Sequence, residues 1–208
     1  MKTVAIVPCY KSSIIAPKVV RELINYVDFV ICVDDCCPEL TGKIIQNNIV
    51  SDKLKVIFHK KNKGVGGATK TGIHFAKKIA AEIIIKIDSD GQMDPSYIPM
   101  LIEPIINQTS DVTKGNRFRN IDVLIRMPKI RLLGNIILSF ITKLSTGYWE
   151  LFDPTNGFIA INTTILSKIQ YQKTDNRYFF ETDLLFRCGL YDLLISEIEI
   201  PTIYKNEK

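Results

Sequence analysis

Residues 83–92 read IIIKIDSDGQ, in which an apolar run leads into two aspartates that stand one residue apart. Isoleucines without polar alternation are typical of a strand buried on both faces, as in a parallel sheet. Similar runs occur at Thr3–Val7, Phe29–Val33 and Lys55–Phe58. Segments with helical spacing separate or follow them, at Pro17–Val27, Glu39–Ile49, Gly67–Ala80 and Ser96–Asn107. This alternation predicts an α/β fold with a mainly parallel, twisted sheet and helices on both faces.

The second half of the chain is less regular. We expect strands at Asp111–Lys114, Gly157–Ile161 and Leu194–Ile200, and helices at Ile130–Leu144 and Glu181–Gly189. No linker rich in Gly, Ser or Pro divides the 208 residues, so we predict a single domain over residues 1–208.

The composition excludes several classes of protein. Apolar residues make up 46% and charged residues 24%, which is typical of a globular domain and not of a disordered chain. The five cysteines have no repeating spacing, which favours reduced thiols in a cytoplasmic protein over a disulfide framework. We find no signal peptide before the first strand. The longest apolar stretch, Ile130–Leu144, is too short and too often interrupted to cross a bilayer.

Residues suited to ligand binding follow three of the predicted strands. They are Pro8-Cys9-Tyr10, Asp34-Asp35 and Asp88-Ser89-Asp90. In an open α/β sheet, ligands bind beyond the carboxyl ends of the strands, so we expect these residues to meet in one crevice. Asp88 and Asp90 would repel each other if unpaired, whereas Mg²⁺ or Mn²⁺ would relieve that repulsion and hold a diphosphate. The alternative is an ordinary polar turn.

Two neighbouring motifs each admit two interpretations. One carboxylate of Asp34-Asp35 either accepts hydrogen bonds from a nucleotide base or ribose, or caps the helix that follows. The glycine-rich segment Asn62–Ala68 either lets an anion approach the start of a helix, or forms a tight turn between strand and helix.

Basic residues gather next to an apolar helix face. The cluster consists of Lys114, Arg117, Arg119, Arg126, Lys129 and Arg131, and the face of Leu133, Ile136, Ile137, Phe140, Ile141 and Leu144. Together they form either an interfacial element that inserts shallowly among anionic lipid headgroups, or a core helix preceded by a solvated basic loop. Interleaved aromatic residues are sparse, so we expect no nucleic-acid partner.

Three carboxylates in the second half stand beside aromatic or apolar residues, namely Asp153, Glu181 and Asp183. Such surroundings raise the pKa of a carboxyl group, which suits a general base. Alternatively, Asp153 begins a turn, and the other two occupy the first turn of a helix, where the helix dipole favours acids.

Together these motifs resemble those of family 2 glycosyltransferases with the GT-A fold, in the branch of dolichyl-phosphate mannose synthases and bacterial polyprenyl-phosphate glycosyltransferases. The resemblance rests on VPCY (7–10), VDD (33–35), NKGVGGA (62–68), DSDGQ (88–92), GNRF (115–118), DPTNGF (153–158) and ETD (181–183). It implies a GT-A domain with a nucleotide-binding half at residues 1–115 and an acceptor-side half at residues 116–208.

The resemblance also implies roles for individual residues. The nucleotide contacts would be Pro8, Tyr10, Val33, Asp35, Asp88, Ser89, Asp90 and Arg117. The ligands of Mg²⁺ or Mn²⁺ would be Asp88, Asp90 and Gln92. The catalytic carboxylates would be Asp153, Glu181 and Asp183. Three places depart from the usual pattern of the family, at Lys11-Ser12, Cys36-Cys37 and Ile159.

We therefore expect an inverting, metal-dependent glycosyltransferase that uses a UDP or GDP sugar. The acceptor is either a polyprenyl phosphate or similar lipid-linked acceptor, or a sugar hydroxyl in polysaccharide or cell-surface glycan synthesis. A phosphate is largely ionised at pH 7 and needs almost no general base, whereas a hydroxyl requires Asp153 or Glu181 as the base. With a lipid acceptor, we expect peripheral association with the inner face of the cell membrane.

Overall fold

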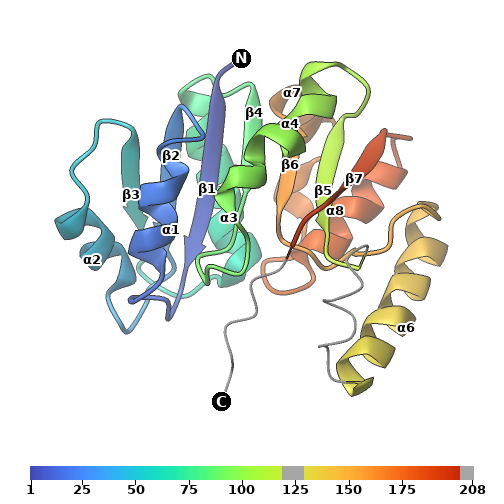
Figure 1. Ribbon diagram of the computed structural model, residues 1–208, viewed down its shortest axis with the longest axis horizontal. Coiled ribbons are helices and arrows are strands. Elements are labelled where there is room, and N and C mark those ends of the chain that lie inside the picture. Colours follow the sequence, from blue (N-terminus) through green and yellow to red (C-terminus); the bar gives the residue numbers. More distant parts are fainter. Residues whose placement is uncertain (119–128, 202–208) are drawn as a thin grey trace.

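Seven short runs form the strands of one sheet in the computed structural model, which describes residues 1–118 and 129–201 (Figure 1). In chain order the elements are β1 (Thr3–Cys9), α1 (Ala16–Leu23), β2 (Phe29–Asp34), α2 (Thr41–Asn48), β3 (Leu54–Phe58), α3 (Gly64–Lys78), β4 (Ile83–Lys86), η1 (Pro95–Tyr97), α4 (Ile98–Ile106), β5 (Val112–Asn116), α6 (Lys129–Thr146), β6 (Ile159–Asn162), α7 (Thr163–Lys168), η2 (Tyr171–Lys173), α8 (Phe180–Gly189) and β7 (Ile195–Glu199). The predicted α/β class is confirmed.

The sheet has the strand order β3-β2-β1-β4-β6-β5-β7. The pairs β1–β2, β1–β4, β2–β3 and β5–β7 are parallel, as the sequence predicted for most of the sheet. β6 is antiparallel to both β4 and β5, which the sequence did not predict. Because Ile159 at the start of β6 pairs with Lys86 at the end of β4, the loop over residues 153–158 lies beside the acidic turn that follows β4.

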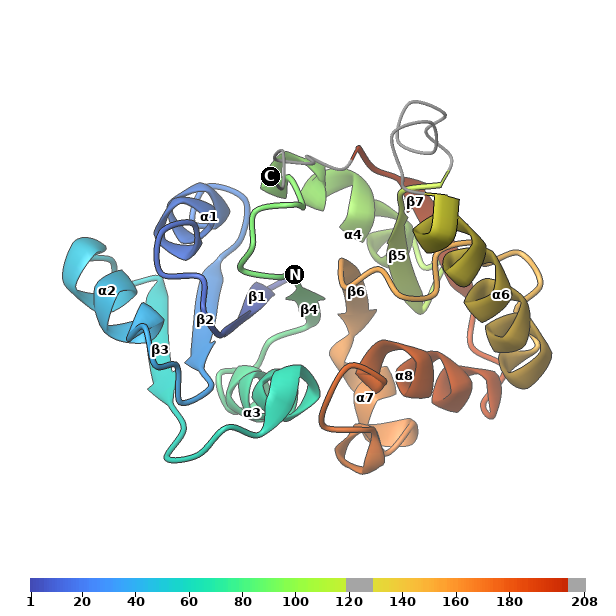
Figure 2. The same cartoon turned by 90° about the horizontal axis from the view of Figure 1, so that it is seen from below.

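Alternate residues of the central strands face opposite sides of the sheet. On β1, Val4 and Ile6 belong to one buried apolar cluster, and Ala5 and Val7 belong to the other. The first cluster lies under α3 and α8 and the second under α1 and α4, so helices cover both faces (Figure 2). Burial of a side chain such as Val or Ile contributes about 1.5–3 kcal/mol to folding. Packing of the two clusters therefore holds the central strands in place, and with them the edge of the sheet at which these strands end.

The observed helices differ from the predicted ones in instructive ways. α3 begins at Gly64 instead of Gly67, because the Asp35 carboxylate accepts the backbone N–H groups of Lys63 and Gly64 at 2.8 and 2.7 Å and so fixes an earlier first turn. α7 was not predicted. It begins after Asn162, whose side chain accepts the N–H of Thr164 at 3.0 Å.

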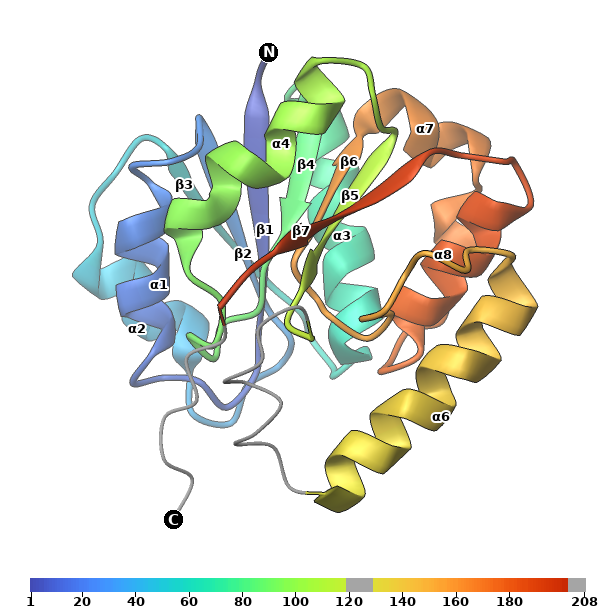
Figure 3. The ribbon, with the colours of Figure 1, turned by 45° about the vertical axis from the view of Figure 1, so that its right-hand side comes forward.

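α6 packs against α8 and extends away from the sheet (Figures 1 and 3). The described side chains of its predicted apolar face are exposed by 51–60%, and they are Ile136, Ile137, Phe140, Ile141 and Leu144. The interpretation as a core helix is therefore wrong for this face. None of the helices in residues 1–118 and 129–201 combines the length and the apolar content needed to cross a bilayer.

The basic cluster is not one solvated surface. Lys114 is fully buried in β5, which is an interior strand between β6 and β7, and Arg117 is ion-paired at 2.7 Å with Asp153. Both interpretations of the cluster required solvated side chains, so both are wrong for these two residues. Arg119 and Arg126 lie outside the described residues, as do the side chains of Lys129, Arg131 and Leu133.

Candidate active site

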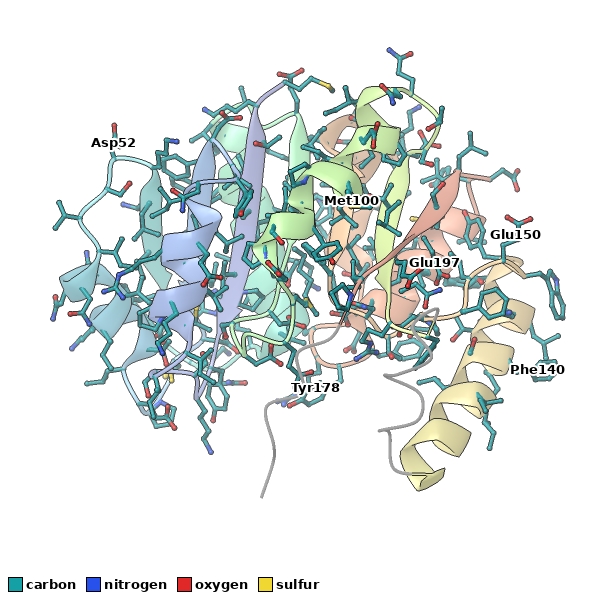
Figure 4. All side chains as sticks on the ribbon, viewed as in Figure 1. Asp52, Met100, Phe140, Glu150, Tyr178 and Glu197 are labelled. Carbon is teal, nitrogen blue, oxygen red and sulfur yellow. The ribbon has the colours of Figure 1, made fainter. Side chains whose placement is uncertain are left out.

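The predicted site residues lie around the carboxyl edge of the sheet, which is the lower edge in Figure 1. β1, β2 and β4 end there, and the reversed strand β6 begins there. Tyr178, from the segment that leads into α8, projects at the same edge in Figure 4 and is 93% exposed. This edge therefore collects residues from both halves of the chain.

Asp88 and Asp90 follow β4 and interact electrostatically. Asp88 Oδ1 lies 2.7 Å from Lys86 Nζ, and the backbone N–H of Gln92 donates to Asp90 Oδ1 at 3.0 Å. Burial raises the pKa of Asp90, and the charge of the nearby Asp88 carboxylate adds to that effect. A divalent cation bound beside the Asp88 and Asp90 carboxylates would relieve this repulsion.

The donor chemistry of this turn fits Mg²⁺ or Mn²⁺. Asp88, Asp90 and the side-chain amide of Gln92 offer oxygen ligands, which these hard cations prefer. Within the described residues, no group of three or more His, Cys, Asp or Glu side chains forms a complete metal site. A metal ion here would therefore take its remaining oxygen ligands from a diphosphate or from water.

The residues predicted to flank the nucleotide have different surroundings. Pro8 and Val33 pair with each other across the sheet and are buried, whereas Tyr10 is 46% exposed and offers its ring for stacking. Ser89 is buried and shares a 2.8 Å hydrogen bond with the hydroxyl of Ser12. That bond ties the loop after β1 to the acidic turn after β4.

Asp34 and Asp35 have separate partners. Asp34 accepts the backbone N–H of Cys37 at 2.8 Å and that of Gly42 at 2.6 Å. It therefore stabilises the turn before α2 and the start of that helix, which is the capping role that the sequence left open for one of the pair.

Asp35 instead holds the start of α3. In addition to the two backbone N–H groups of Lys63 and Gly64, its Oδ1 lies 2.6 Å from His59 Nδ1. The Asp35 residue is 3% exposed. Both carboxylate oxygens are thus bound by groups of the chain itself, and a nucleotide contact at this position would have to share or displace them. His59 was not predicted as a site residue, because a single histidine without a motif carries no signal.

The glycine-rich segment permits close packing against the segment before α8. A Cβ atom on Gly64 would lie 2.4 Å from the carbonyl oxygen of Asn176, and the backbone N–H of Gly67 donates to that same oxygen at 2.9 Å. Together with Asp35, this segment covers the N-terminus of α3. The geometry favours the tight-turn interpretation over an anion site.

Asp153 is fully buried and binds Arg117 in a bidentate pair. Arg117 Nε donates to Asp153 Oδ2 at 2.7 Å and NH2 donates to Oδ1 at 2.8 Å, while the backbone N–H of Arg117 also donates to Oδ2. The side chain of Asp153 has 0% exposure, whereas that of Arg117 keeps 14%. Such a pair fixes the plane of the guanidinium group. In this geometry Asp153 orients Arg117 and has no exposed surface from which to take a substrate proton.

Glu181 and Asp183 lie on different sides of α8. Glu181 faces the sheet, with its Oε1 at 2.6 Å from Lys86 Nζ. Asp183 accepts the backbone N–H of Asp175 at 2.8 Å and so holds the segment that covers α3. The structure brings Glu181 close to the acidic turn, through the shared ammonium of Lys86, and leaves Asp183 apart from it.

Lys86 was not predicted as a site residue. Burial alone lowers the pKa of its ammonium, but the carboxylates of Asp88 and Glu181 together raise that pKa above its usual value. The side chain therefore stays charged. The lysine inside the run IIIKI is a signal that the sequence offered, because a buried charge is costly unless it has a partner.

Lys114, which the sequence pattern places at the end of a strand and in the basic cluster, lies next to the loop over residues 153–158. Its ammonium donates to the carbonyl oxygen of Asn156. Burial lowers the pKa of Lys114 to about 8, although the neighbouring carboxylates of Asp153, Glu181 and Glu197 oppose that shift.

Glu197 on β7 also binds the Asp153 loop and was not predicted (Figure 4). Its Oε1 accepts the backbone N–H of Phe152 at 2.8 Å and that of Asp153 at 2.9 Å, and its Oε2 accepts from the side chain of Asn116. No sequence signal identifies Glu197, because a glutamate in an alternating strand is usually solvated.

The family model described as Glycosyl transferase family 2 matches residues 4–170, from β1 through α7. The chain belongs to this family. It is 35% identical over 213 residues to the UDP-N-acetylglucosamine–dolichyl-phosphate N-acetylglucosaminyltransferase of Methanococcus voltae, with 96% of this chain and 84% of that protein covered. It is 26% identical over 204 residues to the undecaprenyl-phosphate mannosyltransferase of Micrococcus luteus, with 96% and 83% covered. The resemblance inferred from the motifs is confirmed.

A solved enzyme shares the fold of this family 2 glycosyltransferase. The structure of glucosyl-3-phosphoglycerate synthase from Mycobacterium tuberculosis in complex with Mn²⁺, UDP and phosphoglyceric acid matches with a TM-score of 0.73. The two chains are 16% identical, and the match covers 100% of this chain and 72% of that one. A complex of the same enzyme with Mg²⁺ and UDP gives a TM-score of 0.69. The predicted GT-A architecture is confirmed.

Proposed function

We propose that this glycosyltransferase moves a sugar from a UDP-sugar to a polyprenyl phosphate in one inverting, metal-dependent step. An oxygen of the acceptor phosphate forms a bond to the anomeric carbon while the bond from that carbon to the diphosphate breaks, and UDP leaves with the electron pair. The names of the two relatives support this choice. One specifies UDP-N-acetylglucosamine and dolichyl phosphate, and the other specifies undecaprenyl phosphate.

One observation favours a phosphate over a sugar hydroxyl as the acceptor: both candidate bases are already ion-paired. Asp153 is bound by Arg117, and Glu181 is bound by Lys86. A hydroxyl acceptor needs a base that can reach its proton, whereas a phosphate with a second pKa near ~6 arrives largely deprotonated at pH 7. A phosphate therefore suits this site, with Arg117 as its charge-assisted hydrogen-bond donor.

On the donor side, Asp88, Asp90 and Gln92 would hold the metal ion. When bound, the ion takes up the negative charge that develops on the departing diphosphate. Tyr10 stacks on the base, and Asp35 shapes the wall of the nucleotide site by fixing the start of α3. Lys86 keeps the Asp88 carboxylate in place beside the reacting groups.

The exposed face of α6 suits the lipid part of the acceptor. Phe140 projects away from the body of the molecule in Figure 4 and meets Trp149 edge to face, with ring centroids 6.4 Å apart. The ammonium of Lys143 lies 3.8 Å from the ring centroid of Phe152. Aliphatic and aromatic side chains beside a lysine are typical of helices that lie in the headgroup region of a bilayer. We therefore assign this face to the membrane surface that carries the polyprenyl phosphate.

The test is a transfer assay with labelled UDP-N-acetylglucosamine, UDP-glucose and GDP-mannose, each with polyprenyl phosphate in mixed micelles and either Mn²⁺ or EDTA. We expect a lipid-linked sugar joined through one phosphate, with an inverted anomeric centre, from a UDP donor and with Mn²⁺ only. Transfer to glycan hydroxyls without any transfer to polyprenyl phosphate would overturn the proposed acceptor.

A further inference from the structure

The carboxylate of Glu197 links the backbone of Asp153 to the residue that precedes Arg117. Its Oε1 accepts the backbone N–H of Asp153 at 2.9 Å, and its Oε2 accepts from the side chain of Asn116, which directly precedes Arg117 in the chain. Glu197 therefore bridges the loop that carries Asp153 and the end of β5 that carries Arg117. A change at Glu197 therefore reaches the acid and the arginine together.

The side chain of Asn116 has a fixed orientation. Its Oδ1 accepts the backbone N–H of Phe118 at 2.7 Å, which leaves the NH₂ group to face Glu197. Asn116 is buried, so water cannot readily replace either bond. The segment on both sides of Arg117 is thus held by one amide, and that amide is held by Glu197.

β7 is itself held in register. It pairs in parallel with β5, with Lys114 opposite Glu197, and Ile200 packs so closely on Gly115 that a Cβ atom there would lie 2.3 Å from Ile200 Cδ1. Burial raises the pKa of Glu197, and the hydrogen bonds from the Asp153 and Phe152 N–H groups oppose that shift. The carboxylate is therefore a partly buried group on a rigid strand.

We propose that Glu197 is a positioning residue that fixes the position of the Arg117 guanidinium, and hence the affinity of the enzyme for the acceptor phosphate. This inference rests on the proposed function. Glu197 acts through Asp153 and Asn116 and touches neither donor nor acceptor. When Glu197 no longer positions Arg117, acceptor binding weakens and donor binding stays intact.

The two hydrogen-bonding groups can be exchanged to test this. In Glu197→Gln, the new amide faces the amide of Asn116, donor against donor. In Asn116→Asp, two carboxylates face each other. In the double variant, the glutamine donates to the new aspartate, whose second oxygen still accepts from Phe118. We expect each single variant to raise the KM for polyprenyl phosphate by about tenfold with an unchanged KM for UDP-sugar, and the double variant to recover most of that loss.

The matched control is Glu199→Gln, an exposed glutamate on the same strand, which we expect to behave as wild type. Thermal unfolding of every variant measures its folded fraction. A smaller folded fraction lowers apparent kcat and leaves both KM values unchanged, whereas a displaced Arg117 raises the KM for the acceptor. The inference is overturned if the single variants change kcat alone, if donor and acceptor KM rise together, or if the double variant is no better than the single ones. Turnover of the wild type with polyprenyl phosphate tests the proposed function separately.

Discussion

The carboxylates on the two sides of the site are held by different kinds of group. On the nucleotide side, Asp34 and Asp35 accept mainly from backbone N–H groups. On the acceptor side, Asp153 and Glu181 are paired with the cations Arg117 and Lys86. Backbone amides carry no net charge, so they stabilise a carboxylate and leave its charge uncancelled, whereas a cationic side chain cancels it.

Under the proposed function, this difference explains how two anionic substrates share one edge of the sheet. The acidic turn of Asp88 and Asp90 keeps an excess of negative charge, which a divalent cation and a diphosphate can balance together. On the acceptor side, Arg117 neutralises Asp153 and Glu181 shares the Lys86 ammonium with Asp88, so a phosphate that approaches Arg117 meets a carboxylate whose charge is already paired. Variants that change the charge on one side at a time test this difference.

The largest expected effect comes from removing the excess charge on the nucleotide side. We expect the double variant Asp88→Asn, Asp90→Asn to lower kcat/KM by about 10³-fold or more, because the metal loses both charged ligands. We also expect Mn²⁺ with UDP to raise the thermal stability of the wild type and not that of this variant. The control is Asp52→Asn, at an exposed turn far from this edge (Figure 4). Undiminished stabilisation of the double variant by Mn²⁺ with UDP would contradict this assignment.

A second prediction concerns the buried lysine on the acceptor side. The pKa of Lys114 is about 8 in the folded protein and 10.5 when the side chain is free. The unfolded chain binds this proton more tightly than the folded protein does. The destabilisation caused by Lys114 is therefore at its full size below about pH 8, and it falls as the pH rises toward the pKa of the unfolded chain.

Between about pH 7 and about pH 9.5, we expect the unfolding free energy of wild type to rise by about 2 kcal/mol relative to Lys114→Met. Urea unfolding of both proteins at the two pH values measures this difference. Lys43→Met, at an exposed lysine of α2, supplies the pH-independent comparison. A difference between wild type and Lys114→Met that does not change with pH would show that Lys114 titrates normally.

A smaller effect is expected at α6, the helix that we assign to the membrane surface. We expect Ile137→Ser with Ile141→Ser to raise the KM for a vesicle-bound polyprenyl phosphate by about tenfold, since less apolar surface enters the lipid. The KM for a short, water-soluble isoprenyl phosphate stays as in wild type. Val50→Ser, at a fully exposed residue after α2, is the control. An equal rise in KM with both acceptors would show that α6 contributes to acceptor binding or catalysis and not to membrane contact.

Much of the nucleotide side could be predicted from the sequence, because its signals are local. An apolar run that ends in acids marks both a strand and its carboxyl end, as at Ile83–Asp90. The assignment within the pair Asp34-Asp35 could not be made, since two adjacent carboxylates differ only in which backbone N–H groups they meet after folding.

The acceptor side could be predicted less well, because its contacts join residues far apart in the chain. The reversed direction of β6 has no signature in a strand of four residues. Lys86 meets Glu181, and Asn116 meets Glu197, across more than 80 positions. Asp153 was correctly singled out as unusual, but its pairing with Arg117, which decides what it can do, depends on the fold.

The most direct test of the neutralised acceptor side is the kcat of Asp153→Asn with polyprenyl phosphate, measured from pH 6 to pH 9 and corrected for the folded fraction. Asparagine still accepts a hydrogen bond from Arg117, although loss of the buried charge pair lowers stability. The account predicts a kcat within about tenfold of wild type and an unchanged pH profile. A loss of about 10²-fold or more, together with loss of the acidic limb of the profile, would identify Asp153 as a general base and contradict the account.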